Sequence, residues 1–266
     1  MYSFTVNGKL VETEKEVSLL RFLRDDLKLK SIKDGCSQGA CGTCTIIIDG
    51  KATRACVMTT KRAQGMNIVT VEGLSDEEKE IFVYAFGSKG AVQCGFCIPG
   101  MVMSGKALVD KNHNPTEAEI KEAIKGNICR CTGYKKIIEA IDLVAQIKRG
   151  EKQIDKELEK GDKFGVGSNA FRIDVREKVL GYGEYCDDVE MDDMLHVSAV
   201  RSKYPRARIL DIDFSEALAM EGVVAVYTAE DVPNNKVGHL QQDWDVMIPK
   251  GEITRFVGDA ICLVVA

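Results

Sequence analysis

Residues 34–44 read Asp-Gly-Cys-Ser-Gln-Gly-Ala-Cys-Gly-Thr-Cys, and they constrain the fold of the N-terminal part of the chain. The stretch places three cysteines at the spacing C-x4-C-x2-C, and eleven residues separate the last of them from Cys56. Three glycines interrupt it, and glycine lets the backbone take positive φ values and approach a neighbouring group closely. This composition predicts a tight loop that wraps around a group bound by thiolates.

The first set of four cysteines favours an iron–sulfur cluster over zinc. C-x4-C-x2-C is the spacing of plant-type [2Fe–2S] loops, whereas zinc sites favour C-x2-C pairs. A glycine-rich loop also aims backbone N–H groups at the sulfurs, which offsets their negative charge and raises the reduction potential. The sequence therefore predicts a [2Fe–2S] cluster held by Cys36, Cys41, Cys44 and Cys56.

A second set of four cysteines has the spacing C-x2-C-x31-C-x-C and consists of Cys94, Cys97, Cys129 and Cys131. Spacing alone leaves two alternatives open here, because a C-x2-C pair and a C-x-C pair also suit a zinc site. The two remaining cysteines, Cys186 and Cys262, lack a partner pattern and are expected to be structural thiols.

Composition excludes several classes of protein. The 266 residues include 36 Lys and Arg against 41 Asp and Glu, and this acidic balance argues against binding nucleic acid. The longest apolar run, residues 260–266, is too short to span a membrane. The N-terminus carries no signal-peptide pattern, so we expect a cytoplasmic protein whose cysteines serve metal or redox chemistry rather than disulfides.

Residues 1–74 read as short strands around one helix. Asn7-Gly8 and Asp49-Gly50 each separate two strand-like runs and predict hairpins. Leucines on one face predict a helix over 18–27, and residues 66–71 read as a further strand. This order of elements favours a β-grasp, ferredoxin-like sheet with the first cysteine set in a loop beside it.

Residues 75–148 are helical in character. Capping boxes begin at Ser75 and Thr116, Pro99 suits the first turn of a helix, and apolar residues recur at helical spacing over 134–148. Four helices predict a small bundle. Each pair of cysteines in the second set precedes a helix, and the positive ends of helix dipoles would stabilise thiolates there.

Residues 149–170 are charged and contain several glycines, so they read as a linker. Residues 171–266 return to mixed α/β character, with strands expected over 195–200, 208–213, 223–227 and 261–265 and a helix over 215–220. Because the sequence stops inside an apolar run, we expect a piece of a longer polypeptide or a split subunit. We also expect its last strand to pair with a segment outside the chain.

Three blocks of sequence resemble the molybdenum hydroxylases, the family of xanthine dehydrogenase and aldehyde oxidoreductase. They are residues 36–44, residues 93–101 (Gln-Cys-Gly-Phe-Cys-Ile-Pro-Gly-Met) and residues 126–134 (Gly-Asn-Ile-Cys-Arg-Cys-Thr-Gly-Tyr). Cys-Arg-Cys-Thr-Gly-Tyr is highly specific, and it argues against zinc at the second set. Residues 171–266 are similar to the α/β hammerhead segment of that family.

The resemblance implies an α+β chain of three domains: a ferredoxin-like [2Fe–2S] domain over 1–74, a helical-bundle [2Fe–2S] domain over 75–148 and, after the linker, a hammerhead domain over 171–266. It also implies that the second cysteine set holds the cluster nearer to the molybdenum cofactor and that the first set holds the outer cluster. Gln93 matches a position that touches the pterin, so it is a candidate cofactor-binding residue. No catalytic residue is expected in this chain.

The function implied is that of the electron-transfer portion of a xanthine dehydrogenase-like oxidoreductase. Electrons would pass from a molybdopterin site through both clusters to a flavin or another acceptor. The molybdenum cofactor is expected on a continuation or a partner chain, FAD on a separate subunit, and the whole as an oligomeric complex. Three alternatives stay open: an aldehyde oxidoreductase-type enzyme, a free-standing two-cluster carrier and a zinc-stapled interaction module.

Overall fold

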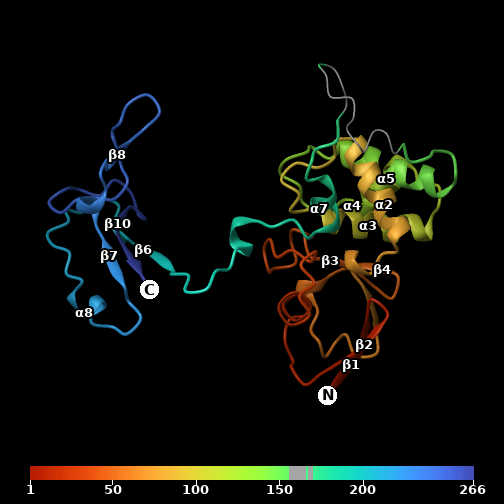
Figure 1. The fold of residues 1–266 in the computed structure, drawn as a ribbon, viewed down its shortest axis with the longest axis horizontal. Helices are drawn as coiled ribbons and strands as arrows, with labels where there is room; N and C mark the ends of the chain where they lie inside the picture. Colours follow the sequence, from red (N-terminus) through yellow and green to blue (C-terminus); the bar gives the residue numbers. More distant parts are fainter. Residues whose placement is uncertain (156–165, 167–169) are drawn as a thin grey trace. The chain divides into compact units, whose positions relative to one another are not determined.

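The computed structural model describes residues 1–155, 166 and 170–266. These residues form two compact units, Met1–Tyr185 and Cys186–Ala266 (Figure 1). In the described parts of the chain, no helix has the length and apolar character needed to cross a membrane.

A five-stranded sheet forms the N-terminal part of the first unit, in the order β2-β1-β5-β3-β4. β1 runs parallel to β5, and the other neighbouring strands are antiparallel. The hairpins predicted at residues 7–8 and 49–50 are confirmed, and all four turn residues have positive φ, from 46° to 80°. The strands are β1 (Tyr2–Val6), β2 (Lys9–Thr13), β3 (Thr45–Ile48), β4 (Lys51–Arg54) and β5 (Asn67–Val69).

The predicted helix over 18–27 is present, with a change of winding. It begins as α1 (Leu19–Arg21) and continues as η1 (Phe22–Asp26), a π-helical segment in which the Leu27 N–H donates to the Phe22 carbonyl. A π turn holds more residues than an α turn, and here both Phe22 and Leu23 are buried against the sheet. Phe22 meets Phe4 of β1 edge to face, with ring centroids 5.8 Å apart.

Four helices form the second part of the first unit and share one apolar core. Both predicted capping boxes are present, since Ser75 and Thr116 each accept from the N–H three residues on. Pro99 lies in the first turn of its helix, as predicted. The helices are α2 (Asp76–Ser88), α3 (Ile98–Lys111), α4 (Glu117–Ile124) and α5 (Lys135–Lys148), and short 3-10 turns, η2 (Ala55–Val57) and η3 (Val71–Gly73), precede them.

A half-buried carboxylate ties three of these helices together. Glu78 of α2 accepts hydrogen bonds from the Lys106 ammonium of α3 at 2.6 Å and the Lys148 ammonium of α5 at 3.0 Å. Burial by itself raises the pKa of Glu78, but the two ammonium groups outweigh it and hold that pKa at about 2. Glu78 therefore stays ionised far into the acid range.

Glu78→Gln is expected to lower the free energy of unfolding by about 1 kcal/mol at pH 7, allowing for solvent screening. Because the folded-state pKa lies below the ordinary value of 4.5, the stabilisation is present above that value and disappears as the pH falls towards 2. Thermal unfolding of both proteins from pH 7 to pH 3 measures this difference. Glu77→Gln, an exposed neighbour in the same turn, is the control; an E78Q deficit that does not shrink at low pH would contradict the assignment.

The helix α7 (Val175–Leu180) packs against α2 and α3 and so lies in the first unit. Val175 and Val179 are buried in the core of the helical bundle, and the Phe171 ring lies against Gly87. The units therefore divide after Tyr185, whereas the sequence places the start of the last domain at residue 171. Most of the predicted linker, residues 156–165 and 167–169, lies outside the described residues.

The second unit contains a three-stranded antiparallel sheet in the order β6-β10-β7 and a small ribbon of β8 and β9. The strands and helix predicted near 195–200, 215–220, 223–227 and 261–265 are confirmed in shortened or shifted form. The elements are η4 (Cys186–Asp188), β6 (Val197–Arg201), α8 (Ser215–Leu218), β7 (Ala225–Tyr227), η5 (Ala229–Asp231), β8 (Lys236–Val237), β9 (Trp244–Asp245) and β10 (Ala260–Val265).

Two expectations for this unit are wrong. Residues 208–213 form no strand: Arg208 bridges to Ile253, Ile209 exchanges backbone hydrogen bonds with Glu252 and Gly251, and no strand continues from there. The expectation that β10 pairs with a strand from outside the chain is also wrong. β10 is the middle strand of the sheet, and β6 and β7 pair with its two edges. Pairing on both edges satisfies the backbone groups that an unpaired terminal strand would expose.

Candidate metal centres

The first cysteine set lies in the loop between η1 and β3 and in the turn that follows β4. The backbone N–H groups of Gln38 and Cys41 both donate to the Cys36 sulfur at 3.4 Å. Hydrogen bonds from Gln38 and then Cys41 lower the pKa of Cys36 to about 7. The loop thus points backbone donors at sulfur, which is the arrangement that stabilises a thiolate ligand.

Cys44 and Cys56 complete the first set on the inner side of the loop. Cys44 lies directly before β3 and is 3% exposed. Cys56 lies in η2, and the N–H of its neighbour Ala55 donates to the Cys44 carbonyl. Burial raises the pKa of Cys44 to about 12, and the neighbouring thiols of Cys56 and Cys41 contribute to the rise. The thiols of the first set therefore lie close to one another.

The second set lies where α3 and α5 begin. Cys97 is the residue before α3, is buried, and has its pKa raised by burial and by the nearby thiols of Cys129 and Cys94. Cys131 has its pKa raised mainly through a hydrogen bond with Cys94. The four thiols of the second set therefore lie near one another, where α3 and α5 begin.

Two side chains that sequence reasoning did not single out support this second set. Burial opposes ionisation of Cys129, but hydrogen bonds from Thr132, whose hydroxyl lies 3.1 Å from the sulfur, lower its pKa overall. The Tyr134 hydroxyl accepts from the Cys129 N–H at 2.9 Å, and Tyr134 has a φ of 69° before α5 begins. Both residues lie inside the Cys-Arg-Cys-Thr-Gly-Tyr block, so the motif itself is the signal that points to them.

The loops of the two sets are in direct contact. The Ile128 N–H donates to the Cys41 carbonyl at 2.8 Å, and the Asn127 amide donates to the Gly42 carbonyl at 2.9 Å. Asn127 is 4% exposed and accepts from the Ser104 hydroxyl of α3 at 2.8 Å. This buried polar network joins the loop of the first set to the chain that leads into Cys129.

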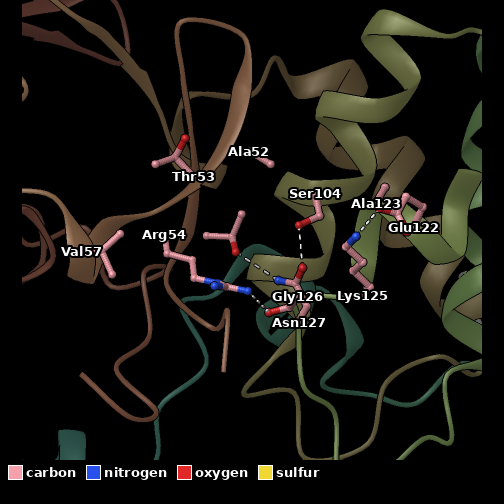
Figure 2. A pocket seen from close by; sticks show the side chains of 11 residues that line it. Ala52, Thr53, Arg54, Val57, Ser104, Glu122, Ala123, Lys125, Gly126 and Asn127 are labelled. Atoms are coloured by element: carbon pink, nitrogen blue, oxygen red, sulfur yellow. Dashed lines mark hydrogen bonds and ion pairs between the residues drawn. The ribbon is translucent and has the colours of Figure 1, made fainter. Parts of the chain in front are cut away.

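An open cavity of about 330 Å³ lies beside this contact, between β4 and the helices α3 and α4. Figure 2 shows Arg54 reaching across it, and its guanidinium donates to the Gly126 carbonyl at 3.1 Å. No local pattern in the sequence distinguishes Arg54 or Asn127 as a residue that bridges the two parts, because the contact joins residues about 70 positions or more apart.

The remaining candidates are placed as follows. Gln93 is exposed beside Cys94, Cys186 is exposed, and Cys262 is buried in β10. Among the described residues, no three His, Cys, Asp or Glu side chains already close around a point at metal-binding distance. Binding a cluster at either set requires the deprotonation of its thiols.

Three families match successive parts of the chain. A 2Fe-2S iron-sulfur cluster binding domain matches residues 2–83, and a [2Fe-2S] binding domain matches residues 70–142. The a/b hammerhead domain of aldehyde oxidase and xanthine dehydrogenase matches residues 180–266. Iron–sulfur binding is thus the property of the families that match the two parts of the first unit.

Whole proteins match as well. Aldehyde oxidoreductase of Megalodesulfovibrio gigas is 37% identical over 98% of this chain and 31% of its own length. The nicotinate dehydrogenase small FeS subunit of Eubacterium barkeri is 44% identical over 52% of this chain and 90% of its own length. The crystal structure of aldehyde oxidoreductase from Desulfovibrio desulfuricans superposes with a TM-score of 0.79 at 32% identity, over 100% of this chain and 31% of that one.

The chain therefore spans about a third of the length of the aldehyde oxidoreductases that it matches. The small subunit, in contrast, is covered almost completely by the iron–sulfur part. Both kinds of relative, the three domain matches and the two cysteine sets agree, and on these grounds this chain belongs to the molybdenum hydroxylase family of xanthine dehydrogenase and aldehyde oxidoreductase.

Proposed function

We propose that the chain binds two [2Fe–2S] clusters, one at Cys36, Cys41, Cys44 and Cys56 and one at Cys94, Cys97, Cys129 and Cys131. The observation that carries the proposal is the gathering of each set of thiols on loops that touch at Gly42 and Asn127. The donor set fits iron, because backbone N–H groups are aimed at Cys36 and Thr132 supports Cys129. The mixed sheet order supports a β-grasp fold, and α2–α5 support a four-helix bundle.

The activity proposed for the assembled enzyme is molybdenum-dependent hydroxylation, in which this chain transfers electrons. When bound, each [2Fe–2S] cluster accepts and passes on one electron at a time. The protein holds the two sites at a fixed separation through Asn127 and the backbone bond from Ile128 to Cys41. A fixed separation matters because the rate of electron transfer between two clusters depends on the distance between them.

Substrate and partners are part of the same proposal. The substrate class is a purine or an aldehyde, and the match of nearly all of this chain to part of the aldehyde oxidoreductases favours the aldehyde. The expected partners are a molybdenum-bearing chain or continuation and a flavin subunit, and the exposed Gln93 amide beside Cys94 is available to the pterin. None of the ten cysteines forms a disulfide, which suits a reducing cytoplasm.

A free-standing carrier is the weaker alternative, because the hammerhead match over residues 180–266 has no use in a mere carrier. A zinc-stapled module is also disfavoured. Two families of iron–sulfur domains match the residues that carry the thiols. Colour would distinguish the two kinds of site, because zinc–thiolate sites are colourless.

The order of the clusters is tested in the assembled enzyme. Cys129→Ser is expected to slow electron delivery to the acceptor by more than about 100-fold, because the cluster nearer to molybdenum is lost. Anaerobic addition of an aldehyde or of xanthine, whichever the wild type oxidises, should then leave the outer cluster unbleached in visible absorbance, while dithionite still bleaches it. Cys44→Ser is the matched variant: its remaining cluster should bleach with substrate. The reverse pattern would overturn the order.

A further inference from the structure

The short helix α7 follows the predicted linker in the sequence and contacts the loop that carries Cys94. The Lys178 ammonium of α7 donates to the Cys94 carbonyl at 2.8 Å, and the Tyr185 hydroxyl donates to the same oxygen at 2.9 Å. Two donors from outside the helical bundle therefore converge on one backbone oxygen of the loop that presents Cys94 and Cys97. Lys178 and Tyr185 lie outside the three cysteine-containing blocks of sequence.

The stem of Lys178 is held in place by close packing on Gly95. A Cβ at Gly95 would lie 2.6–2.7 Å from carbon atoms of the Lys178 side chain, and Gly95 itself has a φ of 88°. The Lys178 side chain is only 15% exposed, and Asp174 lies 3.6 Å from its ammonium group. A lysine confined in this way places its charge at a fixed point beside the cysteine loop rather than in solvent.

A second lysine, Lys33, shares the Tyr185 ring with Lys178. The ammonium groups of Lys178 and Lys33 lie 5.0 and 5.1 Å from the centre of the Tyr185 ring, and Lys33 is 2% exposed. The Tyr185 ring also meets Phe96 edge to face at 5.5 Å. The Cys94–Cys97 loop is thus packed against the Tyr185 ring through Phe96, and the Lys178 and Lys33 ammonium groups lie over that same ring.

We propose that Lys178 is a positioning residue for the cluster of the second set: it fixes the Cys94 loop and raises the reduction potential of that cluster. The inference rests on the proposed function, since it requires a cluster at these four cysteines. Reduction adds negative charge to a cluster, and a fixed cation nearby stabilises the reduced state more than the oxidised one. Because only the second set lies beside Lys178, the effect is selective for one of the two clusters.

The experiment is a dye-mediated redox titration of the full chain, followed by electron paramagnetic resonance so that the two clusters are read separately. Lys178→Met keeps an apolar stem over Gly95 and removes the charge. It should lower the midpoint potential of one cluster by the equivalent of about tenfold in the one-electron equilibrium, or 59 mV, and leave the other unchanged. Lys178→Arg should restore most of the shift.

Arg176→Met is the matched control, because Arg176 belongs to the same helix but pairs with Glu80 on α2. It removes one positive charge without touching the Cys94 loop, and both potentials should stay at their wild-type values. An unshifted potential in K178M, an equal shift of both clusters, or the same shift in R176M would overturn the proposal.

Iron content separates this inference from the proposed function. A wild-type chain with no iron at the second set contradicts the proposed function itself, whereas intact clusters with an unmoved potential in K178M contradict only the role of Lys178. If K178M loses the second cluster, Lys178→Gln, which retains a hydrogen-bond donor, repeats the titration without the charge. Loss of that cluster in both variants with rescue by K178R supports the positioning role, and loss that arginine does not rescue contradicts it.

Discussion

Gly42→Ala is expected to lower the apparent melting temperature of the chain by roughly 6–12 °C, which corresponds to about 3 kcal/mol. A Cβ at this position would lie 2.2 Å from the Gly126 carbonyl oxygen and 2.9 Å from the Asn127 Cα, and both are backbone atoms that cannot rotate away. Gly42 also has a φ of 69°, which alanine adopts only at a cost. The two loops must separate to admit the methyl group, so the hydrogen bond from Asn127 to the Gly42 carbonyl is expected to break.

Gly65→Ala is the control for backbone strain alone. Gly65 has a φ of 74°, and nothing lies within 4 Å of its Cβ position, so it shares the conformational penalty without the collision. Its melting temperature should fall by about 2–4 °C. Equal melting temperatures for the two variants would show that the contact between the cysteine loops is not as close as the structure places it.

The features that sequence reasoning captured are those with local causes. Asn7-Gly8 forms its hairpin because both residues adopt positive φ, and Ser75 caps α2 because a hydroxyl three residues before Glu78 reaches its N–H. The cysteine sets follow the same logic, since the spacing of thiols within a loop limits what the loop can enclose. Such signals need no knowledge of the rest of the chain.

The features that it missed depend on partners distant in the sequence. The apolar run at β10 indicates burial, but only β6 and β7 decide that the burial occurs inside the chain. Residues 208–213 have the composition of a strand, yet their pairing with residues 251–253 ends at Ile209.

The docking of α7 illustrates the same limit at the candidate site. Lys178 lies 84 residues from Cys94 along the chain. Its stretch of sequence gives no local signal for the contact, because the glycine that receives its stem belongs to another motif. Asn127 was visible inside a motif, but its partners Gly42 and Ser104 gave no sign of the connection.

Cys44→Ser is expected to abolish one cluster and leave the other, so the iron content should fall by about half. The two sets lie in different surroundings, Cys44 in the core beneath the sheet and Cys97 in the core of the helices. Cys97→Ser should therefore remove the other half of the iron and the other spectroscopic signal. Cys262→Ser, a buried thiol of the second unit, is the control and should retain all iron. Loss of both clusters from either ligand variant would contradict two independent sites.

The central claim is that the eight cysteines hold two [2Fe–2S] clusters, and metal and sulfide analysis of the wild-type chain tests it most directly. The measurement combines iron, zinc and acid-labile sulfide per chain with the visible spectrum of the oxidised protein. The proposed ligand sets predict about four iron atoms and four sulfides per chain, no zinc and a red-brown colour. A fully loaded, colourless protein that contains zinc at either set, or one that holds only about two iron atoms, would contradict the account.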